Sequence, residues 1–175
     1  LTKPLGTGII LAGQRIGIAS ESDISQAMAS MKLLNRTGAV IMKNYGVKGA
    51  TDITGFGLAG HSLKMARASN VSLHLNMNQV PLIGDTLDLV EDGCIPGAAF
   101  RNLDFVERDS AFSSNLDYNL KMIACDAQTS GGLLMCVAQE SANQIVCELR
   151  DSGLDATAII GKVTERRDKF LYLDE

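Results

Sequence analysis

The sequence predicts an α+β fold, an α/β sandwich in which helices pack on a mixed sheet. Three observations support this prediction. Segments typical of strands and of helices alternate along all 175 residues, neither an internal repeat nor a linker interrupts them, and the composition is 46% hydrophobic and 21% charged. A chain of this length and composition can bury a core of its own. We therefore expect a single domain spanning residues 1–175.

The first part of the chain predicts one strand followed by two helices. The apolar run at 5–12 is bounded by glycines, as is typical of a short buried strand. Apolar residues then recur every three or four positions, which predicts a helix over 22–34 with Ser22 as its N-cap. A second, shorter helix is expected at about 37–45.

The central part predicts two further pairs of elements. A strand at 49–53 should stop at a glycine-rich turn, and a helix should follow over about 58–68. Apolar and polar residues alternate strictly at 71–77, which is typical of a half-buried strand. The next helix is expected over about 84–92 and should end at Gly93.

The last part has weaker signals. The segment 94–118 is rich in Gly, Ser, Asn and Asp, which predicts irregular structure with short elements. Ser141 and Gln144 have the spacing of a capping box, which predicts a helix that ends at Gly153. The remaining elements, one short helix and three strands, are expected at about 115–123, 133–138, 157–163 and 170–173.

Charge and aromatic content argue against a nucleic-acid partner. The net charge is −4, the isoelectric point is about 5.2, and the basic residues are scattered. Nucleic-acid binding usually needs a basic face, and base stacking needs aromatic side chains. This chain is 5% aromatic and has no tryptophan. We therefore expect no nucleic-acid partner.

Hydropathy and cysteine spacing predict a cytoplasmic protein without a membrane contact. No run of 18 apolar residues occurs, and the N-terminal sequence lacks the pattern of a signal peptide. The chain opens at Leu1 without a methionine, which indicates either a part of a longer protein or a trimmed tag. The cysteines form no C-x-x-C pair, so we expect buried, reduced thiols at Cys94, Cys125, Cys136 and Cys147.

The segment 50–61, ATDITGFGLAGH, carries the strongest chemical signal. Asp52 should end a strand, and the glycines that follow let a backbone approach a ligand before a helix N-terminus begins. Such a corner suits a phosphate and its metal ion. Asp52 is the candidate Mg²⁺ ligand, and Thr54, Gly55 and Gly57 are candidate phosphate contacts. Alternatively, the glycines form only a tight turn, and the spacing fits neither a Walker loop nor a dinucleotide-binding motif.

A second glycine-rich segment lies at 126–132, with the sequence DAQTSGG. Thr129, Ser130 and Gly131 could present hydroxyl and amide donors to an anion. The alternative, which the pattern alone favours, is an ordinary turn that leads into a buried strand.

One cysteine and two histidines carry weaker signals. Cys125 has no histidine or lysine placed near it in sequence, which argues against a nucleophilic role. His61 could face the glycine-rich turn that follows Asp52 (the glycine corner), although a packing role is favoured. His74 lies on the polar side of a predicted strand and should be exposed.

Taken together, several segments resemble the C-terminal domain of the selenophosphate synthetases (selenide, water dikinases), in the aminoimidazole ribonucleotide synthetase superfamily. The matching segments, in the family's order, are LTKPLGTG, MKLLN, ATDITGFGLAGH and QTSGGLL at 1–8, 31–35, 50–61 and 128–134. The third segment is the most specific. One departure is Ala127, where the family usually has proline, and this puts a ligand role of Asp126 in doubt.

The resemblance implies one domain of a two-domain enzyme that uses ATP, Mg²⁺ and selenide to make selenophosphate, AMP and phosphate. In that family the phosphates and metals lie at the boundary of the domains. The N-terminal ATP-binding domain, absent from this chain, supplies the reactive cysteine or selenocysteine, a lysine and most of the metal-binding aspartates. The resemblance implies Asp52 as this domain's metal ligand, with no catalytic residue here, a homodimeric full-length protein, and an isolated domain that folds without turnover.

Two alternatives stay open. The first is the C-terminal domain of a sister enzyme that acts on a formylglycinamidine, thiamine monophosphate or carbamoyl substrate. The second is a stand-alone, non-catalytic module that binds another protein.

Overall fold

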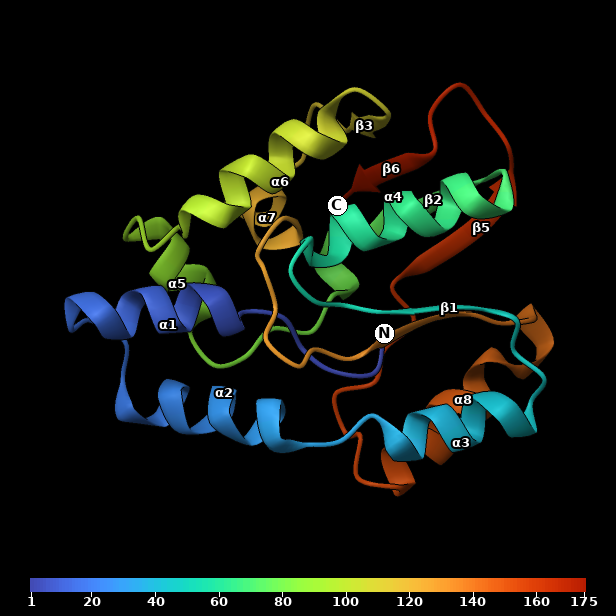
Figure 1. The fold of residues 1–175 in the computed structure, drawn as a ribbon, viewed down its shortest axis with the longest axis horizontal. Coiled ribbons are helices and arrows are strands. Elements are labelled where there is room, and N and C mark those ends of the chain that lie inside the picture. The colour runs from blue at the N-terminus through green and yellow to red at the C-terminus, as the bar shows by residue number, and fades with distance from the viewer.

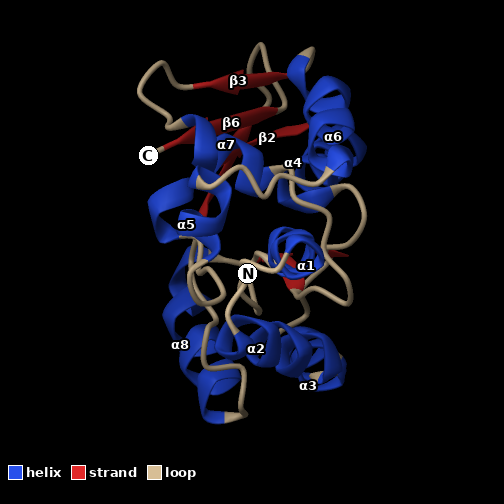
Figure 2. Cartoon of the chain, turned by 90° about the vertical axis from the view of Figure 1, so that its left-hand side faces the viewer, coloured by secondary structure: helices blue, strands red, loops and turns tan.

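The computed structural model describes residues 1–175, and its elements form three tiers (Figures 1 and 2). One outer tier holds α4 to α7 with a four-stranded sheet, the middle tier holds α1 and a two-stranded sheet, and the other outer tier holds α2, α3 and α8. In chain order the elements are α1 (Thr7–Ile16), α2 (Glu21–Lys32), α3 (Arg36–Asn44), β1 (Gly49–Asp52), α4 (Gly57–Ser69), β2 (Val71–Asn76), the 3₁₀ turn η1 (Met77–Gln79), α5 (Thr86–Glu91), α6 (Gly97–Glu107), β3 (Ser110–Phe112), α7 (Tyr118–Ala124), β4 (Leu133–Cys136), α8 (Gln139–Asp151), β5 (Gly161–Glu165) and β6 (Leu171–Asp174).

The larger sheet is mixed and has the strand order β3-β6-β2-β5. Strand β2 pairs antiparallel with β5 and parallel with β6, and β6 pairs parallel with β3. Helix α4 contacts β2 and β6, and α6 contacts β3 (Figure 2). The predicted mixed sheet with helices packed on it is therefore confirmed.

The smaller sheet joins β1 to β4 and fixes the position of both glycine-rich segments. The two strands run antiparallel, with Asp52 at the end of β1 opposite Leu133 at the start of β4. In an antiparallel pair, the segment that leaves one strand lies beside the segment that enters the other. The turn after Asp52 and the loop before Leu133 are therefore neighbours, although they are about 80 residues apart in sequence.

The predicted strand at 5–12 is wrong, because most of this segment belongs to α1. The buried residues Thr7, Ile9, Ile10 and Gly13 follow helical spacing. The N-cap, Gly6, has no side chain to bind the free amide groups of the first turn. Side chains from the loop before β4, 117 to 122 positions away, bind those groups instead. No local sequence pattern reveals such a cap.

Three smaller predictions also need correction. The segment 94–118 contains an 11-residue helix, α6, whose buried residues Ala99, Asn102 and Val106 follow helical spacing. Helix α2 is capped by Ser20, whose hydroxyl accepts a hydrogen bond from the Asp23 amide, and not by Ser22. Helix α8 begins at Gln139, so Ser141 lies inside its first turn and forms no cap.

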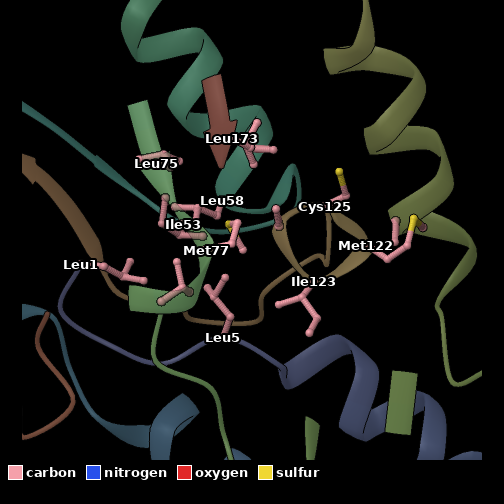
Figure 3. Packing of buried hydrophobic residues seen from close by; sticks show 14 of the residues in the cluster. Leu1, Leu5, Ile53, Leu58, Leu75, Met77, Met122, Ile123, Cys125 and Leu173 are labelled. Carbon is pink, nitrogen blue, oxygen red and sulfur yellow. The ribbon is translucent and has the colours of Figure 1, made fainter. Parts of the chain in front are cut away.

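The main hydrophobic core contains 28 buried residues and lies directly under the turn that follows β1. Ile53 and Leu58 flank that turn, and both side chains are fully buried. Figure 3 shows them packed with Leu5, Met77 and neighbouring core side chains. Since a close-packed core resists displacement, it holds in place the three exposed or partly exposed residues between Ile53 and Gly57, which are Thr54, Gly55 and Phe56.

No helix combines the length and the apolar character that crossing a bilayer requires; the longest have 13 residues. All four cysteines are free thiols. Cys94 and Cys125 are buried as expected, but Cys136 is only half-buried and Cys147 is exposed.

Candidate functional site

Asp52 is the last residue of β1, and its side chain is exposed. It forms no ion pair within the chain. No group of three or more His, Cys, Asp or Glu side chains gathers anywhere in the structure. A cation at this corner would therefore take one carboxylate from this chain and its other ligands from elsewhere. A single exposed carboxylate beside a hydroxyl and backbone groups fits the hard oxygen donors that Mg²⁺ prefers.

The turn between Asp52 and α4 is held by its own backbone. The carbonyl of Thr54 accepts hydrogen bonds from the amides of Gly57, at 2.9 Å, and Gln128, at 3.0 Å. Gly57 has φ +67°, and a Cβ there would lie 2.8 Å from the Cys125 carbonyl carbon. Gly57 is thus buried against the second loop, whereas Gly55 is exposed and Thr54 is half-buried.

Asn102, on α6, ties the two glycine-rich segments together. Its Nδ2 donates to the carbonyls of Gly55, at 2.9 Å, and Cys125, at 3.0 Å. No sequence pattern predicts this role of Asn102, because an asparagine within a polar, glycine-containing stretch gives no sign of where its amide points.

The second loop is likewise packed against the rest of the domain. Lys3, which is almost fully buried, donates from Nζ to the carbonyl of Ser130, and Asn35 donates to that of Gly131. The amide of Thr129 donates to the hydroxyl of Thr7. The side chains of Thr129 and Ser130 remain exposed, and Gly131 is buried. The structure therefore brings Asp52, the first turn and these two hydroxyls to one edge of the small sheet.

Asp126 has a different position from Asp52, because its carboxylate is buried at the N-terminus of α1. Oδ2 accepts hydrogen bonds from the amides of Gly8, at 3.1 Å, and Ile9, at 3.3 Å, and from Nε2 of Gln128, at 2.8 Å. Oδ1 is buried and has no partner within the chain. The contacts describe a helix cap supplied from a distant loop.

Gln128 completes this cap. Its Oε1 accepts hydrogen bonds from the amides of Gly6 and Thr7 and from the Thr7 hydroxyl. Its Nε2 donates to the backbone and side-chain oxygens of Asp126. The second glycine-rich loop thus fixes the start of α1, a role that its sequence does not indicate.

Burial raises the pKa of Asp126 from 3.8 to about 7, although the hydrogen bonds from Gln128, Ile9 and Gly8 favour the charged form. Between pH 4 and pH 7 the folded protein therefore holds a proton that the unfolded chain has released. We expect the free energy of unfolding to fall across this range, by a few kcal/mol, and to level off above it.

Asp126→Asn should remove this part of the pH dependence, because the buried group can no longer ionise. Denaturant unfolding from pH 4 to pH 8 measures the effect. Asp155→Asn, at an exposed position, is the matched control and should keep the slope of the wild type. An unchanged slope in Asp126→Asn would contradict the buried, titrating carboxyl group.

The two histidines lie in different places. His61 is half-buried on α4, with Nε2 3.1 Å from Oγ1 of Thr54 and its ring in T-shaped contact with Phe56. It therefore faces the glycine corner. Burial lowers the pKa of His61, and the negative charge of Asp52 partly offsets this. His74 stacks on Tyr172, with ring centroids 4.4 Å apart, and is half-buried, although the sequence predicted an exposed side chain.

Two further features lie outside the turn that follows Asp52. Burial raises the pKa of Cys125 to about 12, although the positive charge of Lys121 partly opposes this, and almost no thiolate is present at neutral pH. A cavity of about 630 Å³ lies between α8 and β5, and most of the residues that line it are hydrophobic. None of the predicted site residues lines it.

Residues 1–174 match the family described as AIR synthase related protein, C-terminal domain. The chain is also similar to the selenide, water dikinase of Porphyromonas gingivalis. The two are 48% identical over 169 residues, which cover 96% of this chain and 48% of that protein. The chain spans about half the length of the curated relatives it matches.

Two solved structures resemble the fold at low sequence identity. The hydrogenase maturation protein HypE of E. coli has a TM-score of 0.61 and 19% identity, over 98% of this chain and 44% of that one. Thiamine-monophosphate kinase from Stenotrophomonas maltophilia has a TM-score of 0.60 and 16% identity, over 98% of this chain and 48% of that one. At such identities the similarity concerns the fold alone.

Proposed function

The chain belongs to the AIR synthase related family as a C-terminal domain, and from this membership we propose that it is the C-terminal half of a selenide, water dikinase. The parent enzyme would convert ATP, selenide and water to selenophosphate, AMP and phosphate. The observation that carries this proposal is the 48% identity to a protein of that name across nearly the whole chain. The fold-level similarity to HypE and thiamine-monophosphate kinase favours neither of their activities.

Asp52 is the residue that we assign to Mg²⁺. Its exposed carboxylate at the end of β1 supports this assignment. The backbone hydrogen bonds that hold the carbonyl of Thr54 also support it. Bound Mg²⁺ would neutralise charge on the ATP phosphates. Thr54 and Gly55, together with the exposed hydroxyls of Thr129 and Ser130, would contact those phosphates. Gly57 and Gly131 are buried, and would act by allowing the two loops to approach each other.

A partner domain would supply the rest of the site. One carboxylate cannot satisfy a Mg²⁺ ion that binds several oxygen ligands, and no buried thiol here is activated as a nucleophile. The relatives are about twice as long as this chain, which leaves room for such a domain. We propose that the isolated domain folds but does not turn over, and that the full-length protein is a cytoplasmic homodimer.

The full-length gene product tests this proposal directly. With ATP, Mg²⁺ and selenide, we expect AMP and phosphate to form in a selenide-dependent reaction, with selenophosphate detected by ³¹P NMR. Residues 1–175 alone should give no product. Phosphorylation of thiamine monophosphate without any selenide-dependent AMP would overturn the assignment in favour of a sister enzyme. Absence of both reactions would favour a binding module.

A further inference from the structure

The backbone carbonyl of Thr54 is used in hydrogen bonds within the fold, whereas part of the hydrogen-bonding capacity of its side-chain hydroxyl is free. Its carbonyl accepts two hydrogen bonds, from the amides of Gly57 and Gln128. Its hydroxyl has one neighbour, Nε2 of His61, at 3.1 Å. The rest of the hydroxyl's hydrogen-bonding capacity is open on a half-buried residue two positions after Asp52. The hydrogen bond with His61 therefore determines whether the Thr54 hydroxyl can act as a donor or only as an acceptor toward a ligand.

The protonation pattern of the imidazole determines what the hydroxyl can offer. A neutral imidazole has one N–H and one bare nitrogen. If Nε2 is bare, it accepts the Thr54 proton and the hydroxyl can offer only lone pairs. If Nε2 carries the hydrogen, it donates to Oγ1, and the Thr54 O–H is free to donate outward. Only the second arrangement makes the hydroxyl a donor to an anion.

The surroundings of the ring hold it in this place. His61 lies one turn into α4, and its ring packs on that of Phe56 in a T-shaped arrangement, with centroids 5.8 Å apart. Lys64, one turn further on, lies over the face of Phe56, with Nζ 4.8 Å from the ring centroid. Phe56 is itself part of the turn, so the helix, the ring and the turn form one packed unit. A fixed donor costs less to use than a mobile one.

We propose that His61 is a positioning residue, which donates from Nε2 to Thr54 so that the Thr54 hydroxyl points its proton at a phosphate oxygen of the nucleotide bound beside Asp52. This inference rests on the proposed function, because it takes the ligand to be Mg·ATP. Thr54 would touch the phosphate, and His61 would act only through Thr54.

A double-mutant cycle on the full-length gene product tests this coupling, with the Kd for Mg·ATP measured by calorimetry. His61→Phe keeps a ring beside Phe56 but removes the hydrogen bond, and Thr54→Val keeps the shape but removes the hydroxyl. Each should raise the Kd about tenfold, the size expected for one hydrogen bond to a charged group. Because both remove the same interaction, the double variant should also be about tenfold weaker.

Conservative variants provide the controls. His61→Gln places an amide near the position of Nε2, and Thr54→Ser keeps the hydroxyl, so both should stay within about threefold of the wild-type Kd. His74→Phe, on β2 of the four-stranded sheet, should not change the Kd. A double variant about 100-fold weaker, the product of two independent effects, would overturn the proposed coupling. So would a rise in Kd with His61→Gln equal to that with His61→Phe.

The measurement also separates this inference from the proposed function. If wild-type protein binds Mg·ATP and the cycle is non-additive, but no selenide-dependent AMP forms, the His61–Thr54 arrangement stands and the assigned reaction fails. If selenide-dependent AMP forms while the cycle is additive, the reaction stands and the positioning role fails. Failure of the wild type to bind Mg·ATP would overturn both.

Discussion

Asp52→Asn should lower the kcat/KM for ATP of the full-length gene product by at least about 100-fold, since it replaces a charged metal ligand with a neutral amide. Changes in residues that merely support metal ligands commonly cost 10–100-fold, and Asp52 would bind the ion itself. The loss should be partly recovered at higher Mg²⁺ concentration. Steady-state kinetics at several Mg²⁺ concentrations provide the measurement.

The stability of this variant should not change. Asp52 is exposed and forms no ion pair, and such surface substitutions usually alter stability by less than about 0.5 kcal/mol. Asp155→Asn is the matched control, since it removes a carboxylate from another exposed position and should keep full activity. An Asp52→Asn enzyme with the metal dependence of the wild type would remove Asp52 from the site.

Gly131→Ala should destabilise the domain by about 3 kcal/mol and lower its thermal midpoint by about 10 °C. A Cβ at Gly131 would lie 2.2 Å from the carbonyl oxygen of Ile53, which is backbone and cannot swing away. The Ile53 amide also donates to the Gly132 carbonyl, at 2.8 Å. Relief of the clash would therefore separate the two loops and strain this hydrogen bond.

Gly55→Ala is the control for the effect on stability. Gly55 belongs to the first turn, but a Cβ there meets nothing within 4 Å. Its thermal midpoint should stay within about 2 °C of the wild type, since an exposed change of this kind has little effect. Calorimetry or circular dichroism on residues 1–175 can compare the two variants. Equal midpoints for both would show that the loops are not packed as described.

These two predictions concern opposite sides of one contact. The exposed side chain of Asp52 is held in a fixed position, because the residues that follow it in the chain are fixed by burial and hydrogen bonds. Ile53 is fully buried and hydrogen-bonded to Gly132, and Thr54 is hydrogen-bonded to Gln128. A change at Gly131 should therefore also weaken nucleotide binding, through displacement of the turn, although Gly131 itself is buried.

Local patterns predicted elements well where the signals were local. The alternation at 71–77 and the glycine stop at Gly93 correspond to β2 and to the end of α5. The apolar run at 5–12 led to a wrong prediction of a strand, because α1 has no cap within its own sequence. A short apolar run fits either a buried strand or a buried helix face, and the decision came from Asp126 and Gln128.

The sequence alone determined the family resemblance, the mixed fold and Asp52 as the candidate ligand, since each depends on residue types at fixed local spacing. Only the tertiary structure decided that Asp52 is exposed while Asp126 is buried as a helix cap. It also decided that Asn102 and His61 hold the corner. The physical reason is that burial and hydrogen-bond partners depend on how separate segments meet in the fold: Asn102 donates to Gly55, 47 positions away, and the amide of Gly8 donates to Asp126, 118 positions away.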